Sequence, residues 1–105
     1  MAVVSLTKDN FSELTSTGVV VVDFWAEWCG PCQQMLPLLS QFAEMMGDKV
    51  TVGKVNVDEN PELAAQYRVM SIPTIIVLKD GQLVEQMIGV QQPAQLQAAC
   101  EKHMA

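Results

Sequence analysis

The chain has 105 residues, 50% of which are apolar, and its formal net charge is −6 at pH 7. A chain of this length supports one hydrophobic core, so residues 1–105 are expected to form a single domain. The acidic charge argues against nucleic acid or an anionic membrane as a partner, because both attract basic surfaces.

Strands and helices alternate in the first half of the predicted structure. Residues 3–5 resemble a short strand, and apolar residues at helical spacing predict a helix over about residues 8–16. The β-branched run VVVVDFW, residues 19–25, is typical of a central strand that is covered on both faces. Apolar residues then recur at helical spacing from 32 to 46, which predicts a long helix.

A third strand and a third helix follow. The segment VTVGKVNV, residues 50–57, is predicted to be a strand. Asn60 is expected to cap the next helix, and Pro61 should occupy its first position, where a missing N–H costs little.

Two strands and a helix complete the predicted fold. Strands over residues 74–78 and 82–88 flank Asp80-Gly81, which is a strong hairpin signal. A last helix follows Pro93. The order βαβαβαββα combines parallel crossovers with an antiparallel hairpin. The predicted fold class is therefore α/β, with a mixed five-stranded central sheet and helices on both faces.

Cys29 and Cys32 follow the central strand at the start of the long helix. A helix N-terminus carries free N–H groups and the positive end of the helix dipole, which favour a thiolate over a thiol. Because the thiolate is the nucleophile of disulfide exchange, Cys29 is the candidate nucleophile and Cys32 the candidate resolving thiol. Gly30 and Pro31 permit a tight first turn that holds the two sulfurs at bonding distance.

The compartment affects how this cysteine pair is interpreted. The first ten residues, MAVVSLTKDN, lack the basic flank and apolar stretch of a signal peptide, and the longest strongly apolar run, residues 19–22, is too short to span a bilayer. We therefore expect a chain of the reducing cytoplasm. In that compartment, two cysteines at this spacing indicate metal binding or redox catalysis more often than a permanent disulfide.

Two alternatives to a redox pair remain open on these residues alone. A structural disulfide between Cys29 and Cys32 would close a very short loop and add little stability. A zinc site could combine the pair with Cys100 and His103, which have the same spacing. Helical periodicity, however, places Cys100 and His103 on the apolar stripe of the last helix, where a buried thiol and a helix-end histidine are ordinary features.

Asp23 is unusual because it lies within a strand that should be buried on both faces. Loss of water raises the pKa of a carboxyl group, and buried ionisable groups are often functional. We expect Asp23 to exchange a proton with the Cys32 thiol. The alternative is a structural aspartate paired with Lys54 of the neighbouring strand.

Several residues, spread over nearly the whole chain, form a specific combination. They are WCGPC at 28–32, Asp23, Pro37, Lys54, Ile72-Pro73-Thr74, Gly81 and Gly89. This combination resembles the thioredoxin family. The resemblance implies the thioredoxin fold and a protein-disulfide reductase that acts through a redox-active Cys29–Cys32 disulfide, with no bound cofactor and no metal.

The resemblance also implies roles and partners. Cys29 would be the nucleophile, Cys32 the resolving cysteine, and Asp23 the proton carrier, modulated by Lys54. Pro73 would follow a cis peptide bond, and substrate backbone would pair with the chain near Ile72. A thioredoxin reductase, typically using NADPH, would supply electrons to a monomer that reduces disulfide-containing proteins. The implied substrate-binding residues are Trp25, Trp28, Gly30, Pro31, Ile72, Pro73, Thr74, Gly89 and Val90.

The chain differs from the usual family pattern at a few positions. Gln33 stands where a basic residue often follows the second cysteine, and Met70 and Ser71 stand where many relatives have arginine and glycine. Partner preference is therefore expected to differ. Cys100 is additional; we expect it to be buried and inert, with regulatory oxidation or dimer formation as the alternative.

Two other functions remain open beside the reductase. Oxidases and isomerases of related fold usually carry other residues, often histidine, between the cysteines. A binding module would use the same fold without turnover. Cysteine-dependent catalytic reduction of a protein disulfide distinguishes the reductase from a binding module.

Overall fold

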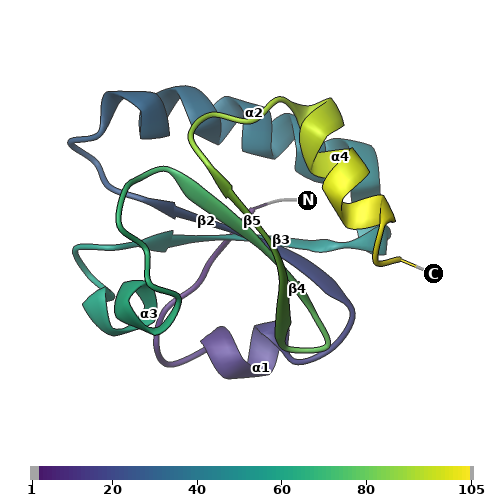
Figure 1. The fold of residues 1–105 in the computed structure, drawn as a ribbon, viewed down its shortest axis with the longest axis horizontal. Coiled ribbons are helices and arrows are strands. Elements are labelled where there is room, and N and C mark those ends of the chain that lie inside the picture. The colour runs from purple at the N-terminus through teal and green to yellow at the C-terminus, as the bar shows by residue number, and fades with distance from the viewer. Residues whose placement is uncertain (1–2, 105) are drawn as a thin grey trace.

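The computed structural model describes residues 3–104, which form a mixed five-stranded sheet with helices on both faces (Figure 1). The predicted element order is confirmed. The elements are β1 (Val4–Ser5), α1 (Phe11–Thr15), β2 (Val19–Trp25), α2 (Gly30–Met46), a 3-10 turn (Gly47–Lys49), β3 (Thr51–Asn56), α3 (Pro61–Gln66), β4 (Thr74–Lys79), β5 (Gln82–Ile88) and α4 (Pro93–Glu101).

Strand β2 lies in the middle of the sheet, whose order is β1-β3-β2-β4-β5. It pairs in parallel with β3 and antiparallel with β4, and β4 pairs antiparallel with β5. In this register Asp23 lies opposite Lys54 on one side and Ile75 on the other. The carboxyl end of β2 leads directly to the two cysteines, so the central strand of the sheet positions them.

The two faces of the sheet carry separate apolar clusters. Helices α2 and α4 cover one face, and α1 and α3 cover the other (Figure 1). Side chains alternate along a strand, so Val19 and Val21 pack beneath α2 and α4, while Val20 and Val22 pack on the opposite cluster. Burial on both faces explains the continuous apolar run in β2. The same alternation places Asp23 on the α2 face.

Helix α1 begins at Phe11, so its predicted start near residue 8 was wrong. The residues before Phe11 form a turn in which Thr7 and Asn10 each donate a backbone N–H to the other residue. The Thr7 N–H donates to Asn10 Oδ1 at 2.7 Å, and the Asn10 N–H donates to the Thr7 carbonyl at 3.2 Å. A side chain that bonds to nearby backbone competes with helix formation, which delays the helix.

Helix α2 begins at Gly30, two residues before the position that apolar spacing predicted. Cys29 is its N-cap residue: its backbone is extended, and its Sγ accepts the Cys32 N–H at 3.2 Å. Gly30 and Pro31 therefore occupy the first turn, as their conformational preferences indicated.

Asn60 does precede α3, but the predicted capping bond is absent. Its Oδ1 instead accepts the Lys8 N–H at 3.1 Å, and its Nδ2 donates to the Asn56 carbonyl at 3.2 Å. The side chain thus connects the start of α3 to the segment before α1. Contacts of this sequence separation leave no local signal in the chain.

Candidate functional site

A disulfide joins Cys29 and Cys32 in the first turn of α2. Their Cα atoms are 5.2 Å apart, within the usual range for a disulfide, so the turn holds the sulfurs together without rearrangement. Cys29 is 5% exposed and Cys32 is fully buried. Cys29 is therefore the more exposed of the two cysteines, as the sequence predicted.

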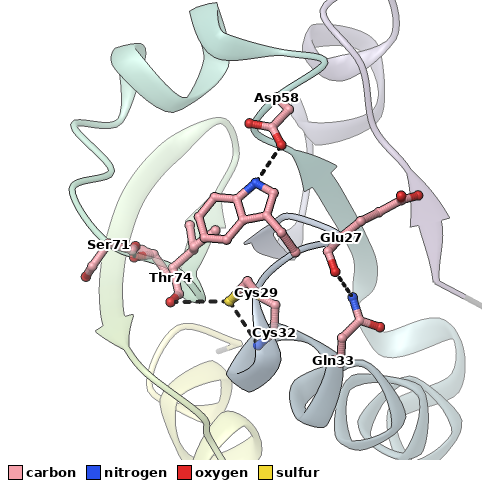
Figure 2. Close-up of a disulfide and its surroundings, with 9 residues drawn as sticks. Glu27, Cys29, Cys32, Gln33, Asp58, Ser71 and Thr74 are labelled. Atoms are coloured by element: carbon pink, nitrogen blue, oxygen red, sulfur yellow. Dashed lines mark hydrogen bonds between the residues drawn. A yellow bond between two sulfur atoms is a disulfide. The ribbon is translucent and has the colours of Figure 1, made fainter.

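The surroundings of the Cys29 sulfur come from the helix and from the loop before β4. Figure 2 shows its contact with the backbone N–H of Cys32. The same sulfur lies 3.7 Å from the Ile72 carbonyl oxygen. Once the disulfide opens, the helix N–H would still donate to a Cys29 thiolate, which lowers the free energy of the charged form.

The residues after Ile72 support the loop whose Ile72 carbonyl lies near the Cys29 sulfur. The Ile72–Pro73 peptide bond is cis, as the resemblance implied. The Gly89 N–H donates to the Pro73 carbonyl at 2.8 Å, which brings the end of β5 next to this loop. The Thr74 hydroxyl is buried and donates to the Ser71 carbonyl at 2.6 Å, so Thr74 supports the loop from inside (Figure 2).

A groove of about 510 Å³ opens beside the disulfide. Most of its surface is apolar, and Cys29 lies in its wall, whereas Cys32 does not. Met70 at its edge is 93% exposed, which is unusual for so large an apolar side chain. The residues that line it are Trp28, Cys29, Gly30, Pro31, Val57, Ala64, Val69, Met70, Ser71 and Ile72.

Trp28 separates this groove from a second, more polar hollow. Its side chain is 71% exposed, and its indole N–H donates to Asp58 at 2.8 Å (Figure 2). Glu27 and Glu59 lie with Asp58 and Trp28 around the second hollow, whose volume is about 460 Å³. Gln33 adds no charge there: its amide donates to the Glu27 carbonyl at 3.3 Å. One side of the groove is therefore acidic.

Asp23 is fully buried on the α2 face of β2. Neither carboxyl oxygen has a hydrogen-bond partner among residues 3–104. Burial raises the pKa of Asp23 to about 7, and the positive charge of Lys54 opposes part of that rise. A carboxyl group that titrates near neutrality can both accept and release a proton at physiological pH.

Lys54 does not form the ion pair with Asp23 that the structural alternative proposed. In the described part of the chain, lysine ion pairs join Lys8 to Glu62 and Lys102 to Glu85. The Lys54 ammonium instead lies over the Trp25 ring, 5.2 Å from the ring centroid.

The structure divides the predicted substrate-binding residues into two groups. Trp28, Gly30, Pro31 and Ile72 line the groove. The others lie behind or beside it. Trp25 packs against the cysteine pair, Pro73 and Thr74 are buried, Gly89 bonds to Pro73, and Val90 packs against the α2–α4 cluster.

Sequence reasoning missed three groove residues, Val57, Ala64 and Val69, and the acceptor Asp58. Val57 follows β3, Ala64 lies within α3 and Val69 follows α3, so only the tertiary fold brings them to the cysteines. Asp58 lies 30 residues after Trp28 in the chain, and no local pattern in the sequence links the two.

Cys100 and His103 are not brought to the Cys29–Cys32 pair. Cys100 is fully buried between α2 and α4, and burial, with a smaller contribution from Glu101, raises its pKa to about 11. His103 Nε2 lies 2.8 Å from Glu85 Oε2 on β5. Within residues 3–104, no three His, Cys, Asp or Glu side chains are grouped to hold a metal ion. None of the helices in that range combines the length and the hydropathy that a membrane span requires.

Known proteins resemble this chain over nearly its whole length. A sequence model described as "Thioredoxin" matches residues 2–102. Thioredoxin of Bacillus subtilis strain 168 is 50% identical over 104 residues, which cover 99% of this chain and 100% of the relative. Thioredoxin of Alicyclobacillus acidocaldarius is 53% identical over 98 residues, which cover 92% of this chain and 93% of the relative.

Solved structures have the same fold. A mutant thioredoxin from Halobacterium salinarum superposes with a TM-score of 0.90 at 34% identity, covering 99% of this chain and 92% of that one. The thioredoxin of Malassezia sympodialis gives a TM-score of 0.87 at 37% identity, covering 100% and 94% of the two chains. With a family model, close relatives and a cysteine pair at the helix start all in agreement, this chain belongs to the thioredoxin family.

Proposed function

We propose that the chain is a protein-disulfide reductase that acts by dithiol–disulfide exchange through Cys29 and Cys32. One observation carries the proposal: the two cysteines form a disulfide at the N-terminus of α2, with Cys29 in the wall of an apolar groove. A structural disulfide would need neither a groove nor a sulfur at a helix N-terminus.

The reaction transfers two electrons in two exchange steps. In the reduced protein, the Cys29 thiolate attacks one sulfur of a substrate disulfide, and the other substrate sulfur leaves as a thiolate. Cys32 then loses its proton and attacks Cys29 Sγ. This step re-forms the Cys29–Cys32 disulfide and releases the second substrate thiolate. The substrate is reduced to two thiols, and this protein is oxidised.

Asp23 is our candidate for the proton acceptor in the second step. The carboxyl group is buried on the face that α2 covers and titrates near neutrality, so it can take the Cys32 proton and later return it. Lys54 would modulate that transfer through its charge. The Ile72 backbone beside Cys29 offers substrate a place to pair as an added strand.

The partners follow from this chemistry and from the family. Disulfide-containing proteins would be the substrates, and a thioredoxin reductase, drawing on NADPH, would return electrons to the oxidised form. We predict that the protein works as a monomer and in the cytoplasm. We also predict that residues 1–105 form one domain. The apolar groove suits an extended polypeptide segment rather than a small polar metabolite.

Insulin reduction with dithiothreitol as the electron source tests the function. The wild type should accelerate precipitation of the reduced insulin chains at substoichiometric concentration. Cys29→Ser should lose this activity, because it lacks the attacking sulfur, while Cys100→Ser, altered only in the core, should keep it. A wild type that binds insulin without turnover dependent on Cys29 would indicate a binding module instead.

A further inference from the structure

Trp25, the last residue of β2, has a neighbour that the exchange reaction does not explain. The ammonium of Lys54 lies over its ring, 5.2 Å from the centroid. Asp23 precedes Trp25 by one full side-chain repeat, so both point to the α2 face, and Asp23 lies opposite Lys54 in the sheet register. The three side chains therefore share one face at the carboxyl end of two parallel strands.

The environment of Asp23 makes this placement consequential. Its oxygens have no hydrogen-bond partner in the described residues, and Lys54 is the charged group whose field acts on it. Its β4 partner is Ile75, and the α2 residues that pack on this side of the sheet, Met35 and Cys32, carry no charge. A lysine stem could carry its ammonium to an unpartnered carboxylate opposite it, yet the ammonium rests on the indole.

We propose that Trp25 is a positioning residue that holds the Lys54 ammonium on its ring face and so keeps it from forming a contact ion pair with Asp23. The proposal deepens the proposed function and rests on it for its biological meaning. The attraction between a cation and an indole face supplies the force, and it is strongest where water is excluded.

The consequence for proton transfer follows from the range of an ionic interaction. A contact ion pair would keep Asp23 ionised at neutral pH, and the carboxyl group could not return a proton. With no cation nearby, the buried carboxyl group would stay protonated and could not accept one. An ammonium held at an intermediate distance leaves the pKa between these limits, near 7. Trp25 would then set the pH range in which the resolving step works.

A purely structural role makes a different prediction. Trp25 also packs against the cysteine pair, so its loss would admit water and change the pKa of Asp23 by hydration alone. That change would be the same whether or not Lys54 is present. A double-mutant cycle therefore separates the two roles.

The test is a titration of the Asp23 carboxyl carbon by nuclear magnetic resonance, from pH 4 to 10, on the disulfide form, in which neither active-site cysteine titrates. Trp25→Leu should lower the pKa of Asp23 by about half a unit or more, because the freed ammonium can approach the carboxylate. Trp25→Phe, which keeps an aromatic face, should give a smaller fall. In a Lys54→Met background, Trp25→Leu should cause less than about half of that shift.

Trp28→Leu is the matched control, since it removes the other tryptophan of the site, whose indole bonds to Asp58 and not to Lys54. It should leave the pKa of Asp23 unchanged. A rise in the pKa on Trp25→Leu, an equal shift without Lys54, or an equal shift from Trp28→Leu would each overturn the proposal. If Trp25→Leu does not fold, the comparison of Trp25→Phe in the two Lys54 backgrounds decides in the same way.

The titration needs no turnover, so it is independent of the insulin assay. If that assay failed while the coupling between Trp25 and Lys54 persisted, the proposed function would fall and the positioning role would stand. If turnover occurs, Trp25→Leu should also move the acidic limb of the reduction rate in the direction of the measured pKa, because Asp23 must be ionised to accept the Cys32 proton.

Discussion

Asp23 lowers the stability of the fold at the pH at which we propose that it transfers a proton. Its pKa is about 7 in the folded protein against 3.8 for the free group. Between those two pH values, the unfolded chain has released the proton and the folded chain retains it. Stability therefore falls as the pH rises from about 4 to 7, and the full loss persists at higher pH. The buried carboxyl group costs most where the proposed reaction runs.

Replacement of Asp23 by asparagine should remove this pH dependence. The free energy of unfolding of Asp23→Asn, relative to wild type, should grow by roughly 4 kcal/mol between pH 4 and pH 8, since each unit of pKa difference is worth about 1.4 kcal/mol. Urea unfolding of the wild type and of the variant, each in its disulfide form, measures this difference at each pH. Any fixed cost of burying the amide cancels in the difference. A constant difference across this range would contradict a pKa near 7.

Among the elements, strand β3 is constrained by its place between β1 and β2. Gly53 pairs with Val4 on one side and Val22 on the other. A Cβ atom at Gly53 would overlap the side chain of Leu6 and approach the Val4 carbonyl to 3.2 Å. Leu6 is 1% exposed, so its side chain can move aside only by displacing packed neighbours. Only glycine lets β1 and the segment after it lie this close to β3.

Gly53→Ala should therefore destabilise the protein by roughly 1–3 kcal/mol, as overpacking of a buried site usually does. Gly30→Ala is the matched control, because a Cβ at Gly30 meets nothing within 4 Å and the residue is helical. Its stability should stay equal or rise slightly with helix propensity. Chemical denaturation of the three proteins gives the comparison. Equal stability of Gly53→Ala and wild type would show that Leu6 relaxes without cost.

The sequence predicted those elements whose signals are local. The β2 run and the Asp80-Gly81 turn were predicted to the residue, because continuous burial and two positive φ angles select those residue types directly. The start of α1 and the hydrogen bond between Asn60 and the Lys8 N–H were not predicted. An Asn side chain can bond to several backbone groups, and the tertiary fold determines which one it contacts.

The site was predicted on the same basis. Cys29, Cys32 and Asp23 stand out by spacing and by unusual burial, and the structure places them at one end of β2. The sequence did not predict the groove residues Val57, Ala64 and Val69, which belong to the β3 and α3 regions and not to the cysteine segment. No single segment of the chain contains enough of the groove wall to suggest a groove.

For the whole molecule, the surface beside Cys29 combines an apolar groove with an acidic side in a chain of net charge −6. Met70 is the most exposed large apolar residue described and stands at the edge of the groove. Covering such a side chain is favourable in proportion to the apolar area removed from water. Met70 is therefore expected to strengthen docking of substrate segments that carry an apolar residue beside the cysteine.

Met70→Gln should lower kcat/KM for such a peptide disulfide by about 5–10-fold, which corresponds to burial of part of one apolar side chain. The kcat value at saturation should change little, because Met70 does not touch the reacting sulfurs. Met45→Gln, at an exposed methionine in α2 that does not line the groove, is the control and should behave as wild type. An equal loss in both variants, or none in either, would remove Met70 from the docking surface.

The slight exposure of Cys29, only 5%, has a consequence for selectivity. A cysteine with so little exposed surface should react only with substrate disulfides that lie on a flexible segment of backbone, because such a segment can move out of its own protein to reach Cys29. Bridges locked inside a rigid partner should stay oxidised, and loosening that partner with mild denaturant should make the same bridge reducible. The low exposure of Cys29 would thus select substrate disulfides by the flexibility of the protein that carries them rather than by its sequence.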